Sequence, residues 1–171
     1  MENINLMRKL PIGVQTFENI RNDNYLYVDK TAFVWRMVNQ GKPYFLSRPR
    51  RFGKSLLLST LEAYFQGRKD LFEGLAIGQL ETEWKKYPVL HLDLNAKKYE
   101  KPADLIAMLN QSLEKWEAMY GDMKKDRSPE ERFAFVIESA SRQAGCGVVV
   151  LVDEYDKQSF RRSVCSVILT N

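Results

Sequence analysis

The sequence contains only two cysteines, Cys146 and Cys165, and a single histidine, His91. None of the three has the spacing of a zinc site, and two cysteines are too few for a disulfide framework. These scarcities exclude a Cys/His metal centre. They also predict reduced thiols of the kind found in cytosolic proteins.

Long apolar runs are absent as well. No stretch approaches the roughly 18 consecutive apolar residues that cross a bilayer. The first residues, Met1 to Asn5, include an acid, and no apolar segment of secretory length follows them before Pro11. We therefore expect a cytoplasmic protein with no membrane partner.

The charge is not strongly of one sign either. A net charge of +4 over 171 residues permits an anionic ligand such as a nucleotide. It is too small and too dispersed to indicate nucleic acid binding by itself. Hydrophobic residues make up 44% of the chain and charged residues 28%, which is typical of one globular domain spanning 1–171.

The order of expected elements indicates an α/β fold. Period-2 and continuous apolar runs predict strands, and apolar residues at spacings of three and four predict helices. Ser128 followed by Pro129 and two acids is typical of a helix start. Strands are expected at 25–28, 44–47, 88–94 and 148–152, and helices at 30–39, 56–65, 103–120 and 128–144. This order predicts a mainly parallel sheet flanked by helices, with ligands at the carboxyl ends of the strands.

A phosphate-binding loop is predicted between the strand at 44–47 and the helix at 56–65. The second half of the P-loop pattern is intact as Gly53-Lys54-Ser55, although Arg48 stands at the first glycine position. Gly53 permits a tight turn, Lys54 reaches the β and γ phosphates, and the Ser55 hydroxyl ligates Mg²⁺. Nearby arginines add positive charge, with a solvated surface role as their alternative. The expected nucleotide-binding residues of this loop are Arg50, Arg51, Phe52, Gly53, Lys54, Ser55 and Leu56.

Two acids, Asp153 and Glu154, directly follow the apolar run 148–152. A hydrophobic strand that ends in acids is the arrangement of a Walker B motif. Asp153 is expected to hold Mg²⁺ through its waters, and Glu154 to act as the general base on the attacking water. Asp156 is a weaker candidate for the same site, and two acids that merely end a strand are the alternative.

These motifs resemble the bacterial AAA-ATPase-like family, whose members carry Y-V-D-K-T, S-R-P-R-R-F-G-K-S and V-D-E-Y-D-K segments. This chain has them at 27–31, 47–55 and 152–157. The resemblance implies a P-loop NTPase-like fold that uses ATP and Mg²⁺, and it makes Arg48 normal for the family. It also suggests that Asp29 helps to form the nucleotide pocket, with helix capping as the alternative. Relatives usually continue into a C-terminal domain that resembles PD-(D/E)XK nucleases.

The motif resemblance ends at Lys157. We divide the chain into an N-terminal extension at 1–43, a Walker A to Walker B core at 44–157 and an atypical tail at 158–171. The tail predicts a domain that is incomplete at its C-terminus, through truncation or a frameshift. In ATPases of this type the strand after Walker B lies between the two motif strands, so either 164–170 fills that gap or the protein is unstable. Thr170 or Asn171 is then an approximate γ-phosphate sensor.

Three functions remain open from the sequence. The first is ATP binding, with hydrolysis in the complete protein. The second is a nucleotide-gated interaction module or inactive remnant that does not hydrolyse ATP. The third is a nucleic-acid module that uses the Arg48–Arg51 cluster and the Lys124–Lys125 pair. The sequence does not indicate an oligomeric state.

Overall fold

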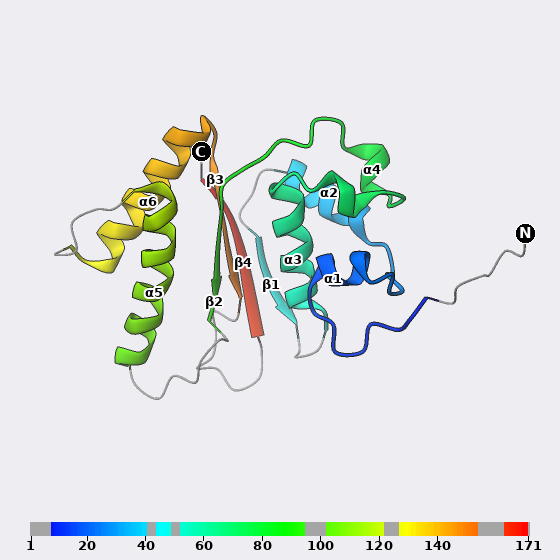
Figure 1. Cartoon of the computed structure of the whole chain (residues 1–171), viewed down its shortest axis with the longest axis horizontal. Helices are drawn as coiled ribbons and strands as arrows, with labels where there is room; N and C mark the ends of the chain where they lie inside the picture. Colours follow the sequence, from blue (N-terminus) through cyan, green and yellow to red (C-terminus); the bar gives the residue numbers. More distant parts are fainter. Residues whose placement is uncertain are drawn as a thin grey trace, which may run out of the picture.

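The computed structural model describes residues 8–40, 44–48, 52–94, 102–121, 127–153 and 163–170. In these residues the chain forms an α/β fold with one four-stranded sheet (Figure 1). The elements are α1 (Phe17–Asn22), α2 (Thr31–Asn39), β1 (Tyr44–Arg48), α3 (Lys54–Phe65), the 3-10 helix η1 (Lys69–Phe72), α4 (Ile77–Leu80), β2 (Val89–Asp93), α5 (Pro102–Tyr120), α6 (Pro129–Ala144), β3 (Val148–Asp153) and β4 (Ser163–Thr170).

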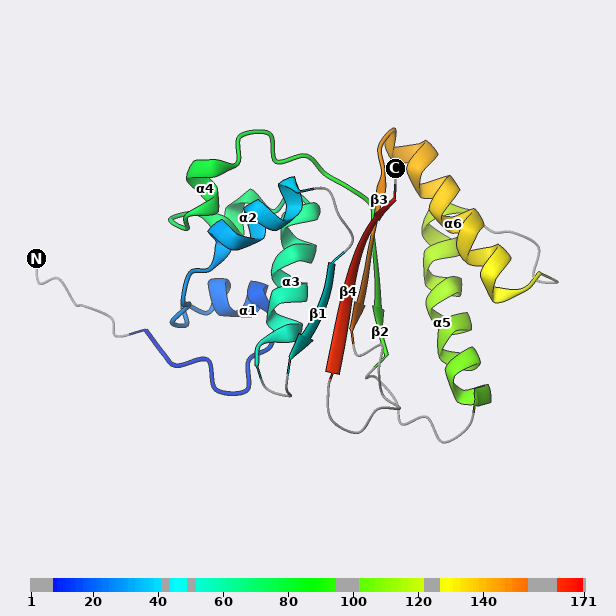
Figure 2. The ribbon, with the colours of Figure 1, turned by 180° about the vertical axis from the view of Figure 1, so that it is seen from behind.

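Helices cover both faces of the sheet, as the sequence predicted. α5 and α6 lie on one face, and α3 lies on the other, with α1, α2 and α4 beyond it (Figures 1 and 2). β3 explains the layering, because its alternate residues join different cores: Val149 and Leu151 pack in the cluster around α3, and Val148 and Val150 in the cluster between α5 and α6. The continuous apolar run of β3 is therefore buried on both faces.

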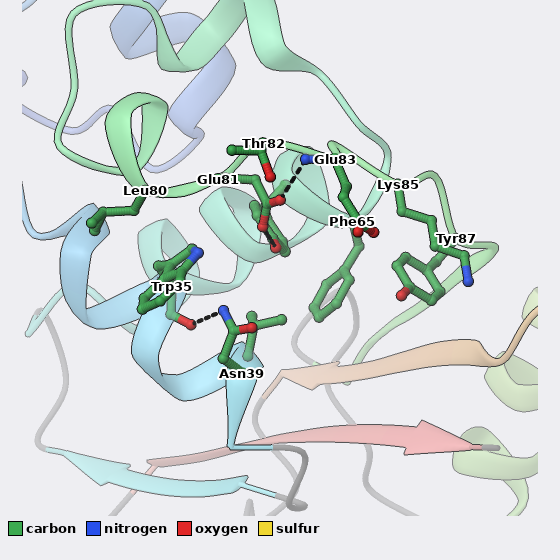
Figure 3. Close-up of a pocket in the computed structure, with 11 residues that line it drawn as sticks. Trp35, Asn39, Phe65, Leu80, Glu81, Thr82, Glu83, Lys85 and Tyr87 are labelled. Carbon is green, nitrogen blue, oxygen red and sulfur yellow. Dashed lines mark hydrogen bonds between the residues drawn. The ribbon is translucent and has the colours of Figure 1, made fainter.

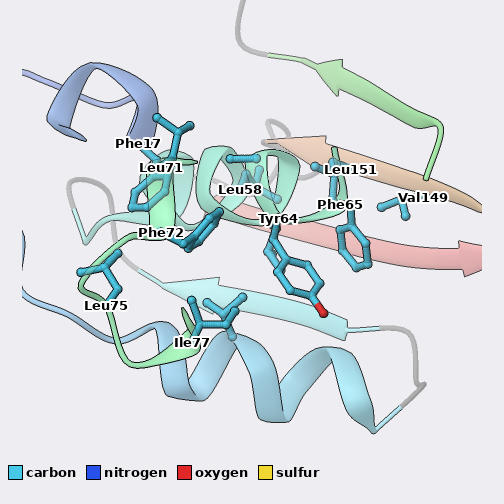
Figure 4. Packing of buried hydrophobic residues seen from close by; sticks show 13 residues of the cluster. Phe17, Leu58, Tyr64, Phe65, Leu71, Phe72, Leu75, Ile77, Val149 and Leu151 are labelled. Atoms are coloured by element: carbon cyan, nitrogen blue, oxygen red, sulfur yellow. The ribbon is translucent and has the colours of Figure 1, made fainter. Parts of the chain in front are cut away.

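The cluster around α3 holds much of the aromatic content of the chain (Figure 4). Phe17 from α1 packs on Phe72 with ring centroids 4.8 Å apart, and Phe72 packs on Trp84 at 5.2 Å. Leu58 and Leu61 on α3 are fully buried beneath these rings. Burial of such side chains contributes about 1.5–3 kcal/mol each, so this cluster fixes α3 against the sheet.

The start of α6 is as predicted. The Ser128 side chain accepts a hydrogen bond from the Glu131 amide, and the Glu131 carboxylate accepts one from the Ser128 amide. Pro129 occupies the first helical turn, and Gly145 ends the helix with a φ of 64°. This capping box satisfies two amides that the helix itself cannot bond.

The expectation of a mainly parallel sheet is wrong. The strand order is β1-β4-β3-β2, and only β2 and β3 pair in parallel, whereas β4 is antiparallel to both neighbours. The position of β4 between β1 and β3 is as expected, but its direction is reversed. The physical reason is the short segment 154–162, because a parallel crossover needs about a dozen residues or more.

The reversed direction also removes Thr170 as a γ-phosphate sensor. Thr170 pairs with Val148 at the beginning of β3, whereas Cys165 pairs with Asp153 at its end. Five residues of strand separate the two positions on β3, which corresponds to ~16 Å. Thr170 therefore lies at the wrong edge of the sheet, and Asn171 lies outside the described residues.

The strand expected at 25–28 does not form. Tyr25 makes an isolated bridge with Lys9, and the Leu26 amide donates to the Lys9 carbonyl at 2.8 Å. The Tyr27 ring packs edge-on against Phe17 at 5.2 Å. Apolar residues here serve packing against helices rather than a sheet, which a strand-like composition does not distinguish. No local sequence pattern indicated the short helices α1 and α4.

Within the described residues, no helix is long and apolar enough to cross a membrane.

Candidate functional site

The candidate site lies where β1 leads into α3 and where β2 and β3 end. α3 begins at Lys54, and Gly53 precedes it with a φ of 73°, in the left-handed region. A Cβ built on Gly53 would meet no atom within 4 Å, so the glycine is needed for its backbone conformation and not for space. The first amides of a helix have no carbonyl of a preceding turn to bond, and the helix dipole makes this end positive. The start of α3 is thus suited to an anion.

The two sequence motifs meet at this point. The Ser55 hydroxyl donates a hydrogen bond of 2.9 Å to Oδ2 of Asp153, across 98 positions of sequence. Asp153 is the last residue of β3 and is only 6% exposed. Its other carboxylate oxygen, Oδ1, is buried and has no hydrogen-bond partner among the residues that the structure describes.

The other expected loop residues have different environments. Lys54 is only 6% exposed, Leu56 is partly buried against the aromatic core, and Phe52 is 62% exposed. The structure therefore brings Lys54, Ser55 and Asp153 together at one end of the sheet. Four predicted site residues lie outside the described part of the chain: Arg50, Arg51, Glu154 and Asp156.

Asp29 is engaged in local structure. Its Oδ1 accepts hydrogen bonds from the amide and hydroxyl of Thr31, at 2.8 and 2.7 Å, and its Oδ2 accepts one from the Ala76 amide at 2.7 Å. Burial raises the pKa of Asp29, but the bonds from Thr31 and Ala76 outweigh it and hold that pKa below its usual value. Asp29 thus secures the start of α2 and ties it to the segment before α4.

One polar pair near the site was missed by sequence reasoning. Nδ1 of His91 on β2 lies 2.8 Å from Oε2 of Glu62 on α3, and Nε2 of His91 is buried without a partner in the described structure. Burial lowers the pKa of His91, but Glu62, Asp153 and Asp93 together raise it above its ordinary value. Two spacings in the sequence could have indicated this pair. Glu62 lies two helical turns after Ser55, on the same face of α3, and His91 lies two residues before Asp93, on the same face of β2.

The donor set fits Mg²⁺ better than a soft or fully caged metal. The described residues contain no group of three or more His, Cys, Asp or Glu side chains that could hold a metal ion. Mg²⁺ usually keeps several waters and binds proteins through one or two oxygen ligands. A serine hydroxyl beside a buried carboxylate with one unpartnered oxygen provides those ligands.

Comparisons with known proteins agree with the motif resemblance. A family model described as "Predicted AAA-ATPase" matches residues 11–164, so the similarity continues past Lys157 into the start of β4. A protein of Azotobacter chroococcum mcd 1, described as an uncharacterized protein in the vnfD 5' region, is 44% identical over 154 residues. That alignment covers 88% of this chain but 29% of the relative, so the chain spans less than a third of the relative's length. No solved structure matches the chain.

Proposed function

The chain belongs to the predicted AAA-ATPase family, and from this premise we propose that it binds ATP with Mg²⁺ at a P-loop-type site formed by Gly53, Lys54, Ser55 and Asp153. The P-loop NTPase fold and a cytoplasmic location are parts of the same proposal.

The observation that carries the proposal is the Ser55–Asp153 hydrogen bond. A Gly-Lys-Ser tripeptide alone is common in sequences, and an acid that ends a strand is common too. Their meeting at the carboxyl end of β3 and the start of α3 is the arrangement that Mg²⁺–phosphate chemistry requires. The unpartnered Asp153 Oδ1 supports it further, because a buried carboxylate oxygen is costly unless it serves a ligand.

Each residue has a distinct part in the proposal. The Lys54 ammonium neutralises phosphate charge, and the first amides of α3 donate to phosphate oxygens. The Ser55 hydroxyl and the Asp153 carboxylate hold Mg²⁺ or its waters, and Arg50 and Arg51 add positive charge. When bound, Mg²⁺ supplies charge neutralisation at the phosphates.

Hydrolysis is the finer part of the proposal. Glu154 directly follows Asp153 and is the candidate general base, which accepts a proton from the attacking water. Turnover would also need a residue that stabilises charge in the transition state, and such an arginine is worth about 10³–10⁵ in rate. Nucleotide binding is therefore the core of the proposal, and hydrolysis with Glu154 as the base is its extension.

The test is thermal unfolding of the chain with and without Mg·ATP, compared with Lys54→Ala. A ligand at 100 times its dissociation constant stabilises the folded state by about 2.7 kcal/mol, which raises Tm by several degrees. We expect this shift in the wild type and its loss in Lys54→Ala. An equal shift in both proteins would contradict the assignment of Lys54.

Two controls separate the phosphate site from general effects. Lys69→Ala removes a lysine outside the candidate site, in η1, and should keep the full shift. Magnesium chloride without nucleotide should give a smaller shift than Mg·ATP, because most of the proposed contacts are to phosphate. A cooperative transition that Mg·ATP does not move at all would reject ATP binding by this chain.

A further inference from the structure

A cavity lies at the carboxyl end of α3, whereas the candidate nucleotide site lies at the start of that helix. Figure 3 shows the residues that line the cavity. It has a volume of about 440 Å³, opens to solvent, and is bordered by the last turns of α2 and α3 and by the segment 80–87. Phe65 in its wall is eleven residues after Lys54, which places it ~16 Å away along the helix axis. The cavity is therefore separate from the proposed phosphate site.

Two carboxylates, Glu81 and Glu83, line this cavity. Glu81 is held in a fixed orientation, because its Oε2 accepts a hydrogen bond from the Tyr64 hydroxyl and its Oε1 accepts one of 2.9 Å from the Glu83 amide. Burial raises the pKa of Glu81, but the bonds from Tyr64 and from backbone amides outweigh it and keep that pKa low. Glu81 is therefore a positioned, ionised group at neutral pH.

Neither carboxylate forms an ion pair within the described part of the chain. Asn39, the last residue of α2, also lines the cavity and brings the negative end of that helix dipole to it. Lys85 is the one basic residue of the lining. The two carboxylates exceed that single charge, so the lining carries a net negative charge.

Aromatic rings form part of the remaining walls, together with Val38, Asn39, Leu80 and Thr82. Trp35, Phe65 and Tyr87 project around the carboxylates from three different segments (Figure 3). Aromatic faces attract ammonium and guanidinium groups. The chain itself provides an example at the rim, where Nζ of Lys85 lies 5.2 Å from the centre of the Tyr87 ring.

From these features we propose that the cavity binds a cationic group on an apolar stem, a guanidinium or a primary ammonium. The positive head pairs with Glu81 and Glu83, and the stem lies against the half-buried ring of Trp35. A phosphate or carboxylate ligand is disfavoured by the same charges. The cation belongs either to a free small molecule or to an arginine or lysine side chain of a polypeptide, and both have the same chemistry.

The test uses agmatine, the tripeptide amide acetyl-Gly-Arg-Gly-amide, and butylurea as a neutral probe of similar shape. Binding is followed by the ¹H–¹⁵N signal of the Trp35 indole. We expect both cations to move this signal and butylurea to leave it in place. We also expect affinity to fall as salt is raised, because the pairing is electrostatic and partly exposed.

Variants of the two acids locate the contact. Glu81→Gln should weaken agmatine binding by about tenfold, and Glu83→Gln by less, because Glu83 is more exposed. Glu138→Gln changes an exposed acid on α6, beyond the opposite face of the sheet, and should leave binding unchanged. Equal Tm values for the variants and the wild type show that the fold is kept.

The outcomes decide whether the cavity binds a cation and whether that cation is a small molecule or a polypeptide side chain. Binding of the tripeptide tenfold or more above agmatine assigns the site to a polypeptide side chain, and equal affinity assigns it to a small cation. Equal binding of butylurea, unchanged affinity in both glutamine variants, or no response to either cation overturns the proposal. None of these results depends on whether ATP binds at Ser55.

Discussion

The hydroxyl of Ser55 at the start of α3 donates a hydrogen bond to the carboxylate of Asp153 at the end of β3, with 2.9 Å between the two oxygens. Ser55→Ala removes this bond and leaves both carboxylate oxygens of Asp153 without a described partner. We expect the free energy of unfolding to fall by about 1.5–3 kcal/mol, the usual range for a hydrogen bond to a charged group. Urea denaturation of the ligand-free chain measures it.

Ser55→Thr is the matched control, because it keeps the hydroxyl. It should retain most of the stability that the alanine variant loses, and it should retain the Mg·ATP shift. If the two variants lose equal stability, the hydroxyl does not hold Asp153 in solution.

Gly53 and Gly145 provide a matched pair of backbone tests. Both have positive φ, of 73° and 64°, and a Cβ at either position would meet no atom within 4 Å. Alanine at each position should therefore cost about 1–2 kcal/mol of stability through backbone strain alone. Only Gly53→Ala should also weaken Mg·ATP binding, because only Gly53 adjoins the proposed phosphate site. Thermal shifts with Mg·ATP on both variants check this. If both variants lose binding equally, the loss comes from lower stability of the fold and not from a change at the phosphate site.

Asp29 gives a prediction about pH. Its pKa lies below the usual value of 3.8, so its contribution to stability is present above that value and is lost as pH falls through the lower, folded-state pKa. Asp29→Asn should lower the free energy of unfolding by roughly 1 kcal/mol at neutral pH. The difference from the wild type should shrink below about pH 4. Urea denaturation at a series of pH values measures both.

The same variant separates two roles of Asp29. The hydrogen bonds to Thr31 and Ala76 indicate a structural role, so Mg·ATP affinity of the folded Asp29→Asn protein should stay near that of the wild type. A large loss of affinity with little loss of stability would instead support the nucleotide-pocket role.

Arg132 on α6 and Glu117 on α5 form two hydrogen bonds of 2.7 Å, with side chains only 8% and 5% exposed. Glu117→Gln leaves a buried guanidinium without its counter-charge, and we expect a loss of about 3–5 kcal/mol. The exposed Glu114 on the same helix is the control, and Glu114→Gln should change stability by less than about 0.5 kcal/mol. The double variant Glu117→Leu with Arg132→Met should recover most of the loss, since no charge then remains buried.

Local sequence patterns predicted several elements closely. The apolar run 148–152, the Ser128-Pro129 helix start and the helix after Gly53 formed at the expected places. Each depends on interactions between residues close in sequence: capping, dipole and the period of apolar side chains. The family match over residues 11–164 confirms the family that the Gly53-Lys54-Ser55 and Asp153 motifs indicated.

The errors arose where distant segments decide the outcome. Tyr25 to Val28 has the composition of a strand, but Tyr27 packs on Phe17, and within the described part of the chain Tyr25 makes only an isolated bridge with Lys9. The pairing of His91 with Glu62 depends on how β2 packs against α3, which no local pattern specifies. Arg50, Arg51 and Glu154 lie outside the described residues, so the roles assigned to them remain predictions.

The sequence by itself determined which residues hold the proposed phosphate and metal chemistry, because Lys54, Ser55 and Asp153 belong to short motifs with local structural consequences. Only the tertiary structure decided the direction of β4, and with it the position of Thr170 at the far end of the sheet from Asp153. Only the tertiary structure placed Glu81 against Tyr64 at a cavity of its own. Both outcomes depend on contacts between residues far apart in the chain, which are selected by packing of the whole fold and not by local preference.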